Sequence, residues 1–253
     1  MSEVSRNALV QAADEWLQPQ LFKDYGPNGL QVEGRERVRH VVSGVTASRA
    51  LIDAAIADGA DAVVVHHGLF WRGQDGRVTG WMKQRLQRLL AHDINLIAYH
   101  LPLDAHPTLG NNAQLARVLG IALADGERFG DQRLGFVGER AMPSAHALAD
   151  DVAARLGRAV TVVAEPTDRP VRRIGLCTGG AQGYFEAAIA AGVDVFITGE
   201  ISEPQAHYAR ESGVAFIACG HHASERYGAP ALAQALADRF GLTHRFIDVP
   251  NPA

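Results

Sequence analysis

The sequence predicts an α/β fold in which helices cover both faces of largely parallel sheets. Apolar runs of strand length alternate with alanine-rich segments of helical period, as expected for βαβ units. The runs are apolar at successive positions, which is typical of strands buried on both faces. A long segment also recurs at a constant offset. Together these observations indicate two related α/β lobes produced by an internal duplication.

The first half contains three predicted strands and three predicted helices in alternation. The strands are "VRHVVSGV" (38–45), "DAVVVHH" (61–67) and "INLIAYH" (94–100). The helices are "SRALIDAAIADG" (48–59), "WMKQRLQRLLAHD" (81–93) and "NNAQLARVLG" (111–120). Gly59 and Gly120 stand where a glycine commonly ends a helix.

The second half adds a strand–helix–strand segment and then repeats the first pattern. Residues 133–139, 144–157 and 159–165 form that segment. Residues 44–67 then align with residues 177–200 at an offset of 133, so that Asp61 meets Asp194. With a small further shift, "INLIAYHLPLD" matches "VAFIACGHHASE" (214–225). We therefore expect a first lobe at 1–125 and a second lobe at 126–253.

Composition excludes several classes of protein. The chain has 253 residues with a net charge of −4, and no block of Lys and Arg stands out. This argues against electrostatic binding to duplex DNA or an anionic membrane, although a local basic patch is compatible with it. Only two cysteines occur, and no apolar run approaches the ~20 residues that span a bilayer. We expect a cytoplasmic protein without a signal peptide.

Polar residues that bind metals stand at the ends of the predicted strands. Ligands of α/β sheets bind outside the carboxyl ends of parallel strands, so these side chains should converge. They are His66, His67, His100, Asp104, Glu200, His221, His222 and Glu225. Successive strand residues point to opposite faces. The adjacent histidines therefore either share one site at a turn or serve two ions a few ångströms apart.

Other polar features have two interpretations each. Cys219 precedes Gly220 and His221, and it is either a nucleophile or, as we favour, a small buried hydrophobe. The segment "CTGGAQG" (177–183) is either a phosphate-binding loop or a flexible turn. Thr46, Ser48 and Arg72 lie beside strand ends, where they serve substrate binding or are simply polar loop residues.

Several segments together resemble a known family. They are "GPNGLQVEG" (26–34), "GVTAS", "ADAVVVHHGLFW", "LIAYHLPLDAHPTLGNN", "VFITGEISEPQAHYARESG", "GHHASERYG" and the tail "FIDVPNP". The chain resembles the dinuclear metal-centre family commonly labelled GTP cyclohydrolase 1 type 2, or Nif-three-like proteins. The resemblance covers nearly the whole chain, in the short bacterial form.

The resemblance implies a site, a subunit architecture and an assembly. It implies two divalent metal ions per subunit between the lobes and a toroidal homohexamer. The implied metal ligands are His66, His67, Asp104, His221 and Glu225, with Glu225 bridging both ions. His100 and Glu200 also match positions near the site, and we assign them to proton transfer. His207 matches as well and is assigned to substrate binding.

The donor set points to hydrolytic chemistry. Imidazole and carboxylate suit Zn²⁺, Fe²⁺, Mn²⁺ or Ni²⁺, among which the sequence does not choose. Two bridged ions can generate hydroxide near neutral pH. We expect a metal-dependent hydrolase acting on a nucleotide or purine compound, as the family label implies. The alternatives are a phosphoesterase or damaged-nucleotide hydrolase, and a non-catalytic metal-binding scaffold or regulatory protein.

Overall fold

The chain forms two compact α/β units in the computed structural model, which describes residues 2–167 and 169–253. Unit 1 comprises residues 1–103 and 228–250, and unit 2 comprises residues 104–227 and 251–253. These observations confirm the predicted fold class. The units differ from the expected lobes because a helix and a strand near the C-terminus pack in unit 1. The lobes 1–125 and 126–253 stay a prediction about the duplicated segments.

Unit 1 is built on a five-stranded sheet. Its strands, in spatial order, are β13 (Thr243–Phe246), β4 (His40–Thr46), β5 (Ala62–His67), β6 (Asn95–Ala98) and β2 (Gly29–Val32). The first four run parallel, and β2 is antiparallel to β6. A separate antiparallel pair joins β1 (Val4–Ser5) to β3 (Arg37–Val38). The central strands β5 and β6 are buried over almost their whole length, as their apolar runs, residues 62–65 and 96–98, predict.

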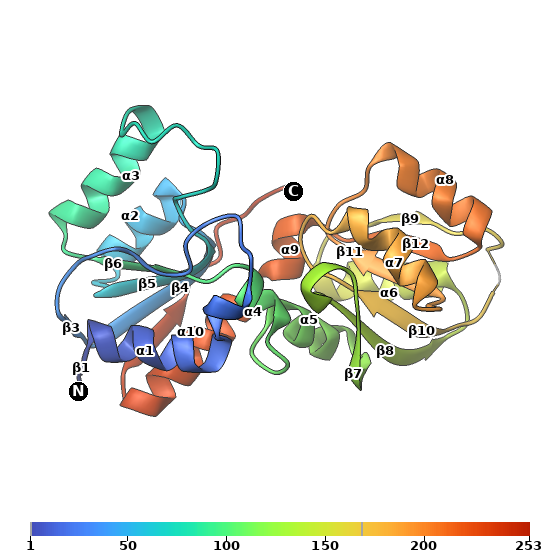
Figure 1. The fold of residues 1–253 in the computed structure, drawn as a ribbon, viewed down its shortest axis with the longest axis horizontal. Helices are drawn as coiled ribbons and strands as arrows, with labels where there is room; N and C mark the ends of the chain where they lie inside the picture. The colour runs from blue at the N-terminus through green and yellow to red at the C-terminus, as the bar shows by residue number, and fades with distance from the viewer. Residues whose placement is uncertain (1, 168) are drawn as a thin grey trace. The chain divides into compact units, whose positions relative to one another are not determined.

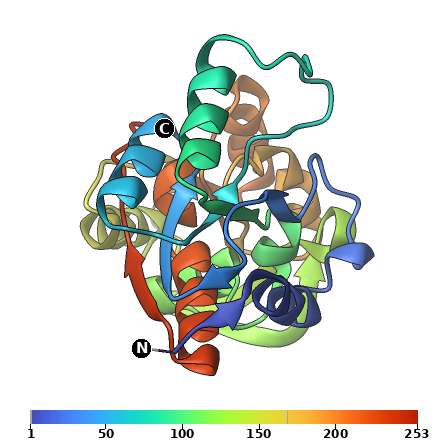
Figure 2. The same cartoon turned by 90° about the vertical axis from the view of Figure 1, so that its left-hand side faces the viewer.

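Helices cover both faces of this sheet. They are α1 (Arg6–Leu17), α2 (Arg49–Ala57), α3 (Gly80–Ala91) and α10 (Gly228–Phe240), with a short helix η1 at Pro19–Leu21. Figures 1 and 2 show α2 and α3 on one face and α1 and α10 on the other. Alternate residues of β5, Val63 and Val65, share a core with Leu51 and Ile52 of α2. Gly59 follows α2 with a positive φ of 72°, which agrees with the predicted helix end.

Unit 2 is built on a six-stranded mixed sheet. The strands, in spatial order, are β7 (Ala122–Phe129), β8 (Gly135–Met142), β10 (Val171–Leu176), β11 (Val195–Thr198), β12 (Ala215–Ala218) and β9 (Thr161–Val163). Neighbouring strands pair in parallel at β10–β11 and at β11–β12. The flanking strands pair antiparallel with them or with each other.

The helices of unit 2 also lie on both faces of its sheet (Figure 1). They are α5 (Asn111–Leu119), α6 (Ala145–Leu156), α7 (Phe185–Ala190), α8 (Glu203–Ser212) and α9 (His221–Glu225), with short helices η2 (Asp131–Arg133) and η3 (Gln182–Tyr184). Leucines of α5 and α6 pack with Ile174 and Ile197 in an aliphatic core. On the α7 face, Phe185 contacts Phe196 and Phe216 at ring-centroid distances of 5.9 and 4.9 Å. Within the described ranges, every helix is too short or too polar to cross a membrane.

The two units repeat the same strand register, as a duplication requires. In unit 1, Val41 pairs with Ala62 across β4 and β5. In unit 2, Ile174 pairs with Val195 across β10 and β11. Each residue of the second pair stands 133 positions after its counterpart, the offset found in the sequence. The third strands pair equivalently, through Ala62–Asn95 and Val195–Ala215.

The repeated aspartate has the same structural role in each unit. The Asp61 carboxylate accepts hydrogen bonds from the backbone N–H groups of Arg39 and His40, at 2.7 and 3.0 Å. The Asp194 carboxylate likewise accepts from two consecutive backbone N–H groups, at Arg172 and Arg173, both at 2.9 Å. These bonds satisfy donors at the entry to a parallel strand.

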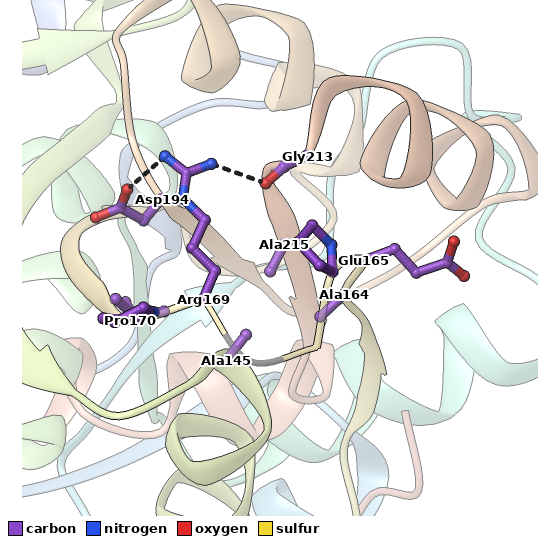
Figure 3. Close-up of a pocket in the computed structure, with 10 residues that line it drawn as sticks. Ala145, Ala164, Glu165, Arg169, Pro170, Asp194, Gly213 and Ala215 are labelled. Atoms are coloured by element: carbon purple, nitrogen blue, oxygen red, sulfur yellow. Dashed lines mark hydrogen bonds and ion pairs between the residues drawn. The ribbon is translucent and has the colours of Figure 1, made fainter.

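An arginine contacts the repeated aspartate in both units. Arg35 Nη1 lies 2.7 Å from Asp61 Oδ1. In unit 2, Arg169 lies 3.5 Å from Asp194 Oδ1 and donates to the carbonyl oxygen of Gly213 at 3.4 Å (Figure 3). This pair of aspartates is therefore part of the scaffold of each sheet.

Candidate metal centre

Three histidines gather at the carboxyl end of the unit 1 sheet. His66 and His67 end β5, and His100 follows β6. One nitrogen of each ring lies within 4.8 Å of one nitrogen of each of the others. The ring centroids are 4.6 Å apart for His66 and His67, and 5.0 and 5.7 Å from these rings to His100. We call these three residues the imidazole cluster.

The adjacent histidines are held by their Nδ1 atoms. His66 is buried, and its Nδ1 donates to the carbonyl oxygen of Tyr99 at 3.0 Å. His67 Nδ1 lies 3.1 Å from Thr46 Oγ1, on the neighbouring strand β4. Anchoring one ring nitrogen by a hydrogen bond is typical of histidines that bind a metal through the other. Thr46 therefore orients His67, a role not assigned to it from the sequence.

His100 is oriented by a carboxylate from a distant loop. Its Nδ1 donates to Asp24 Oδ1 at 2.6 Å. Asp24 also accepts from Asn28 Nδ2 and from the backbone N–H of Leu101, both at 2.9 Å. Burial works against ionisation of Asp24, but these hydrogen bonds and the charge of His100 outweigh it and lower its pKa. Asp24 thus stays an acceptor and fixes the ring of His100.

Unit 2 brings together two buried carboxylates. Asp104 belongs to the short helix α4 (Leu101–Ala105), and Glu225 ends α9. They are 7% and 2% exposed, and one oxygen of each lies within 4.8 Å of the other. Asn111 Nδ2 and Thr178 Oγ1 donate to Asp104 Oδ1 at 2.9 and 3.2 Å. Two buried negative charges at this separation are costly without a cation or a shared proton.

The five-residue helix α9 carries His221 and Glu225 on one face. This helix is separate from α10, which begins at Gly228. His221 Nε2 lies 3.2 Å from Glu225 Oε2, and His221 Nδ1 donates to Glu200 Oε1 at 2.6 Å. The hydrogen bond with Glu225, helped by Glu200, raises the pKa of His221 to about 9 despite partial burial.

Gly179 makes room for the Glu225 carboxylate. A Cβ atom at this position would lie 2.1 Å from Glu225 Oε1 and 3.3 Å from His221 Nε2. Its φ is +71°, a conformation that favours glycine. The glycine-rich segment "CTGGAQG" therefore borders the carboxylates, which neither sequence interpretation foresaw. We call Asp104, His221 and Glu225 the carboxylate cluster.

Comparison with known proteins identifies the family. The family model Duf34/NIF3 (NGG1p interacting factor 3) matches residues 4–252. The chain belongs to the Duf34/NIF3 family. A Pseudomonas aeruginosa relative, named GTP cyclohydrolase 1 type 2 homolog, is 52% identical over 99% of both chains. An Escherichia coli K12 relative of the same name is 50% identical over 97% of this chain and 98% of its own.

A solved structure confirms the fold of this Duf34/NIF3 protein. That chain, described as protein ybgI of unknown function, matches with a TM-score of 0.93 at 49% identity. The match covers 99% of this chain and all of the other. The resemblance inferred from the sequence is thereby confirmed across the full length.

The remaining substrate-binding candidates of the Duf34/NIF3 chain have structural partners. Ser48 is the N-cap of α2 and accepts from the backbone N–H of Leu51 at 3.2 Å. Arg72 Nη2 donates to the backbone carbonyl of Asp24 at 2.8 Å. His207 is 57% exposed on α8 and lies 2.9 Å from Glu203. Their roles toward a substrate stay predictions.

Both cysteines are buried thiols. Burial raises the pKa of Cys219 to about 12, so it is protonated at neutral pH. Burial and the nearby charges of Asp104 and Glu225 raise the pKa of Cys177 well above its ordinary value. The favoured interpretation of Cys219 as a buried hydrophobe agrees with this, because a nucleophilic cysteine needs an accessible thiolate.

Proposed function

We propose that this protein is a metal-dependent hydrolase that binds two divalent ions through both clusters. The residues that would hold the ions are His66, His67, Asp104, His221 and Glu225, and Glu225 would serve as a ligand to both. The observation that carries the proposal is the pair of buried carboxylates, Asp104 and Glu225, within 4.8 Å of one another. A divalent cation offsets their repulsion, and neutral imidazoles are its usual partners in such sites.

The donor set fits the metal on three independent counts. One nitrogen of each ring of the imidazole cluster lies within 4.8 Å of one nitrogen of each other ring, and imidazole binds metals in its neutral form. Their Nδ1 atoms are held by a carbonyl, a hydroxyl and a carboxylate, which orients the rings. The set lacks thiolates and suits Zn²⁺, Fe²⁺, Mn²⁺ or Ni²⁺.

The proposal also accounts for β5, a strand that ends on two adjacent histidines, because His66 and His67 are two of the proposed ligands.

The residues around the ligands serve proton transfer and orientation. When bound, two such ions supply Lewis acidity and lower the pKa of coordinated water. The side chain of Glu200 is 44% exposed and accepts a hydrogen bond from His221, which supports a role in proton exchange with solvent. His100, held by Asp24, is the corresponding group in unit 1. We assign both to proton transfer.

We propose a nucleotide or related purine compound as the substrate. The curated relatives carry the name GTP cyclohydrolase 1 type 2 homolog, which supports this substrate class. Arg72 would contact its phosphate or base, together with Thr46, Ser48 and His207. A cytoplasmic homohexamer is part of the same proposal, and light scattering of the purified protein tests the assembly.

Metal stoichiometry tests the proposed ligands. We expect untagged protein to retain two divalent ions per chain. Glu225→Gln should lower occupancy at both positions, because one bridging ligand serves both ions, and His67→Asn should also weaken binding. Glu203→Gln is the matched control, since Glu203 is 80% exposed on α8. Two ions at full occupancy in Glu225→Gln would refute the bridging role.

Turnover tests the chemistry separately. Protein loaded with each metal is offered GTP, with formate release as the readout, and then a generic phosphodiester. Formate supports a cyclohydrolase, and phosphodiester cleavage alone indicates a phosphoesterase. Unchanged metal binding without either reaction would overturn the hydrolase and favour a metal-loaded scaffold.

A further inference from the structure

A pocket in unit 1 borders the imidazole cluster. It is formed by two short segments, residues 24–27 and 70–72, and has a volume of about 350 Å³. Pockets that bind small molecules begin at about 300 Å³. The cavity beside Asp194 in unit 2 (Figure 3) measures only about 10 Å³, which is room for about one water molecule. The pocket of unit 1 is therefore the stronger candidate for a ligand.

The two segments are joined by two hydrogen bonds and by a close backbone approach. The backbone N–H of Arg72 donates to the carbonyl oxygen of Tyr25 at 2.6 Å. Arg72 Nη2 donates to the carbonyl oxygen of Asp24 at 2.8 Å. Gly26 approaches Phe70 so closely that a Cβ atom would lie 2.3 Å from its carbonyl oxygen. The walls are thus preorganised, which lowers the entropy cost of binding.

Two aromatic side chains of the pocket contact rings of the imidazole cluster. Trp71 and Tyr25 meet the ring of His100 edge to face, with centroids 5.0 and 6.0 Å away and interplanar angles of 86° and 66°. Trp71 also lies 5.9 Å from His67. A ligand held against these two rings would lie beside the histidines proposed to bind and serve the metals.

The side chains of the pocket match one ligand class. Tyr25 is 59% exposed and Trp71 is partly exposed, so both present aromatic surface on which a flat heterocycle can stack. Arg72 is exposed, and its bond to the Asp24 carbonyl holds a guanidinium suited to phosphate. The Asp24 carboxylate is directed to His100 and the N–H of Leu101.

We propose that this pocket binds a purine nucleotide, with the base stacked on Trp71 and Tyr25 and a phosphate on Arg72. The inference rests on the proposed function, because it names the part of the chain that holds its substrate. It adds Trp71 and Tyr25 to the residues that determine specificity. It also predicts that binding depends on a planar base and not on phosphate alone.

Tryptophan fluorescence of the metal-loaded protein tests the stacking. Trp16→Phe with Trp81→Phe leaves Trp71 as the only tryptophan of the three. GMP should then quench its fluorescence to saturation, guanosine should do so with weaker affinity, and inorganic phosphate should not. No quenching by GMP or guanosine would overturn the proposal.

Substitutions test which residues bind which part of the nucleotide. By calorimetry, Trp71→Leu should weaken GMP binding roughly 5- to 150-fold, the value of one stacked base. Trp71→Phe should retain most of the affinity, and Arg72→Gln should weaken GMP but not guanosine. Trp81→Phe is the control, since Trp81 lies 55% exposed on α3. Equal GMP affinity in Trp71→Leu, Tyr25→Leu and the unmodified protein would refute the site.

The two proposals fail in different ways. Nucleotide binding that depends on Trp71, without formate release or phosphodiester cleavage, supports the pocket and overturns the hydrolase. Nucleotide turnover with an unchanged KM in Trp71→Leu supports the hydrolase and overturns the pocket. Metal content is measured for each variant, so that a lost ion is not mistaken for a lost base contact.

Discussion

Replacing Gly179 by alanine should lower both the stability of the protein and its affinity for metal, for two different structural reasons. The new Cβ would lie 2.1 Å from Glu225 Oε1, about 1.3 Å closer than an ordinary van der Waals contact. Gly179 cannot retreat easily, because its N–H donates to Ser224 Oγ at 2.9 Å and its carbonyl accepts from Gly199 N at 2.9 Å. The buried carboxylate must therefore move.

The expected magnitudes differ for stability and for metal binding. Alanine at a φ of +71° costs about 1–2 kcal/mol of unfolding free energy through the left-handed backbone alone. The carboxylate is the flexible end of the Glu225 side chain, so moving it adds little strain. The movement breaks the 3.2 Å contact between Glu225 and His221. Displacing the proposed bridging ligand should lower metal affinity at least as much as losing an outer hydrogen bond, about 10- to 100-fold.

Gly192→Ala is the matched control for the backbone cost. Gly192 has a φ of +72°, and no atom lies within 4 Å of the Cβ position. Urea unfolding of both metal-free variants should show similar losses of stability. Calorimetric metal titration should show weaker binding only in Gly179→Ala. If Gly179→Ala binds metal as tightly as Gly192→Ala, the assignment of Glu225 as a ligand is wrong.

Three further predictions follow from the contacts described above. Asp61→Ala and Asp194→Ala should each lower the unfolding free energy by about 2–4 kcal/mol in denaturant titrations, because two backbone N–H groups lose their acceptor. A loss below about 0.5 kcal/mol would contradict the structural role of that aspartate. Chelation of the metals should lower the melting temperature, because Asp104 and Glu225 then lie together without a cation. At a free metal concentration about 100-fold above Kd, binding adds about 2.7 kcal/mol to the unfolding free energy. An unchanged melting temperature would argue against metal binding. Glu200→Gln retains an acceptor for His221 Nδ1, so metal content should persist while the pH profile of turnover shifts, and an unchanged profile would exclude proton transfer by Glu200.

The sequence alone indicated the duplication, because the apolar pattern of a strand is a local property. Side chains alternate along a strand, so two segments with the same apolar pattern pair in the same way. The offset of 133, found for residues 44–67 and 177–200, also relates the Val41–Ala62 pair to the Ile174–Val195 pair in the structure. The clustering of His66, His67 and His100 followed from the rule that parallel strands end at one edge.

The pocket of unit 1 was not predictable in this way. Residues 24–27 carry no local signal for the ligand site, and more than forty residues separate them from Trp71. Their contact depends on how the loop before β2 packs against the segment after β5. Asp24 was missed for the same reason, although its carboxylate orients His100 at 2.6 Å.

By itself, the sequence determined the α/β class, the repeat of three parallel strands and the histidines that end them. These follow from apolar periodicity and turn chemistry, which act over a few neighbouring residues. Only the tertiary structure decided that α10 and β13 belong to unit 1, that Gly179 borders Glu225, and that Tyr25 and Trp71 flank His100. These contacts join residues far apart in the chain, and their energies depend on packing that no local pattern encodes.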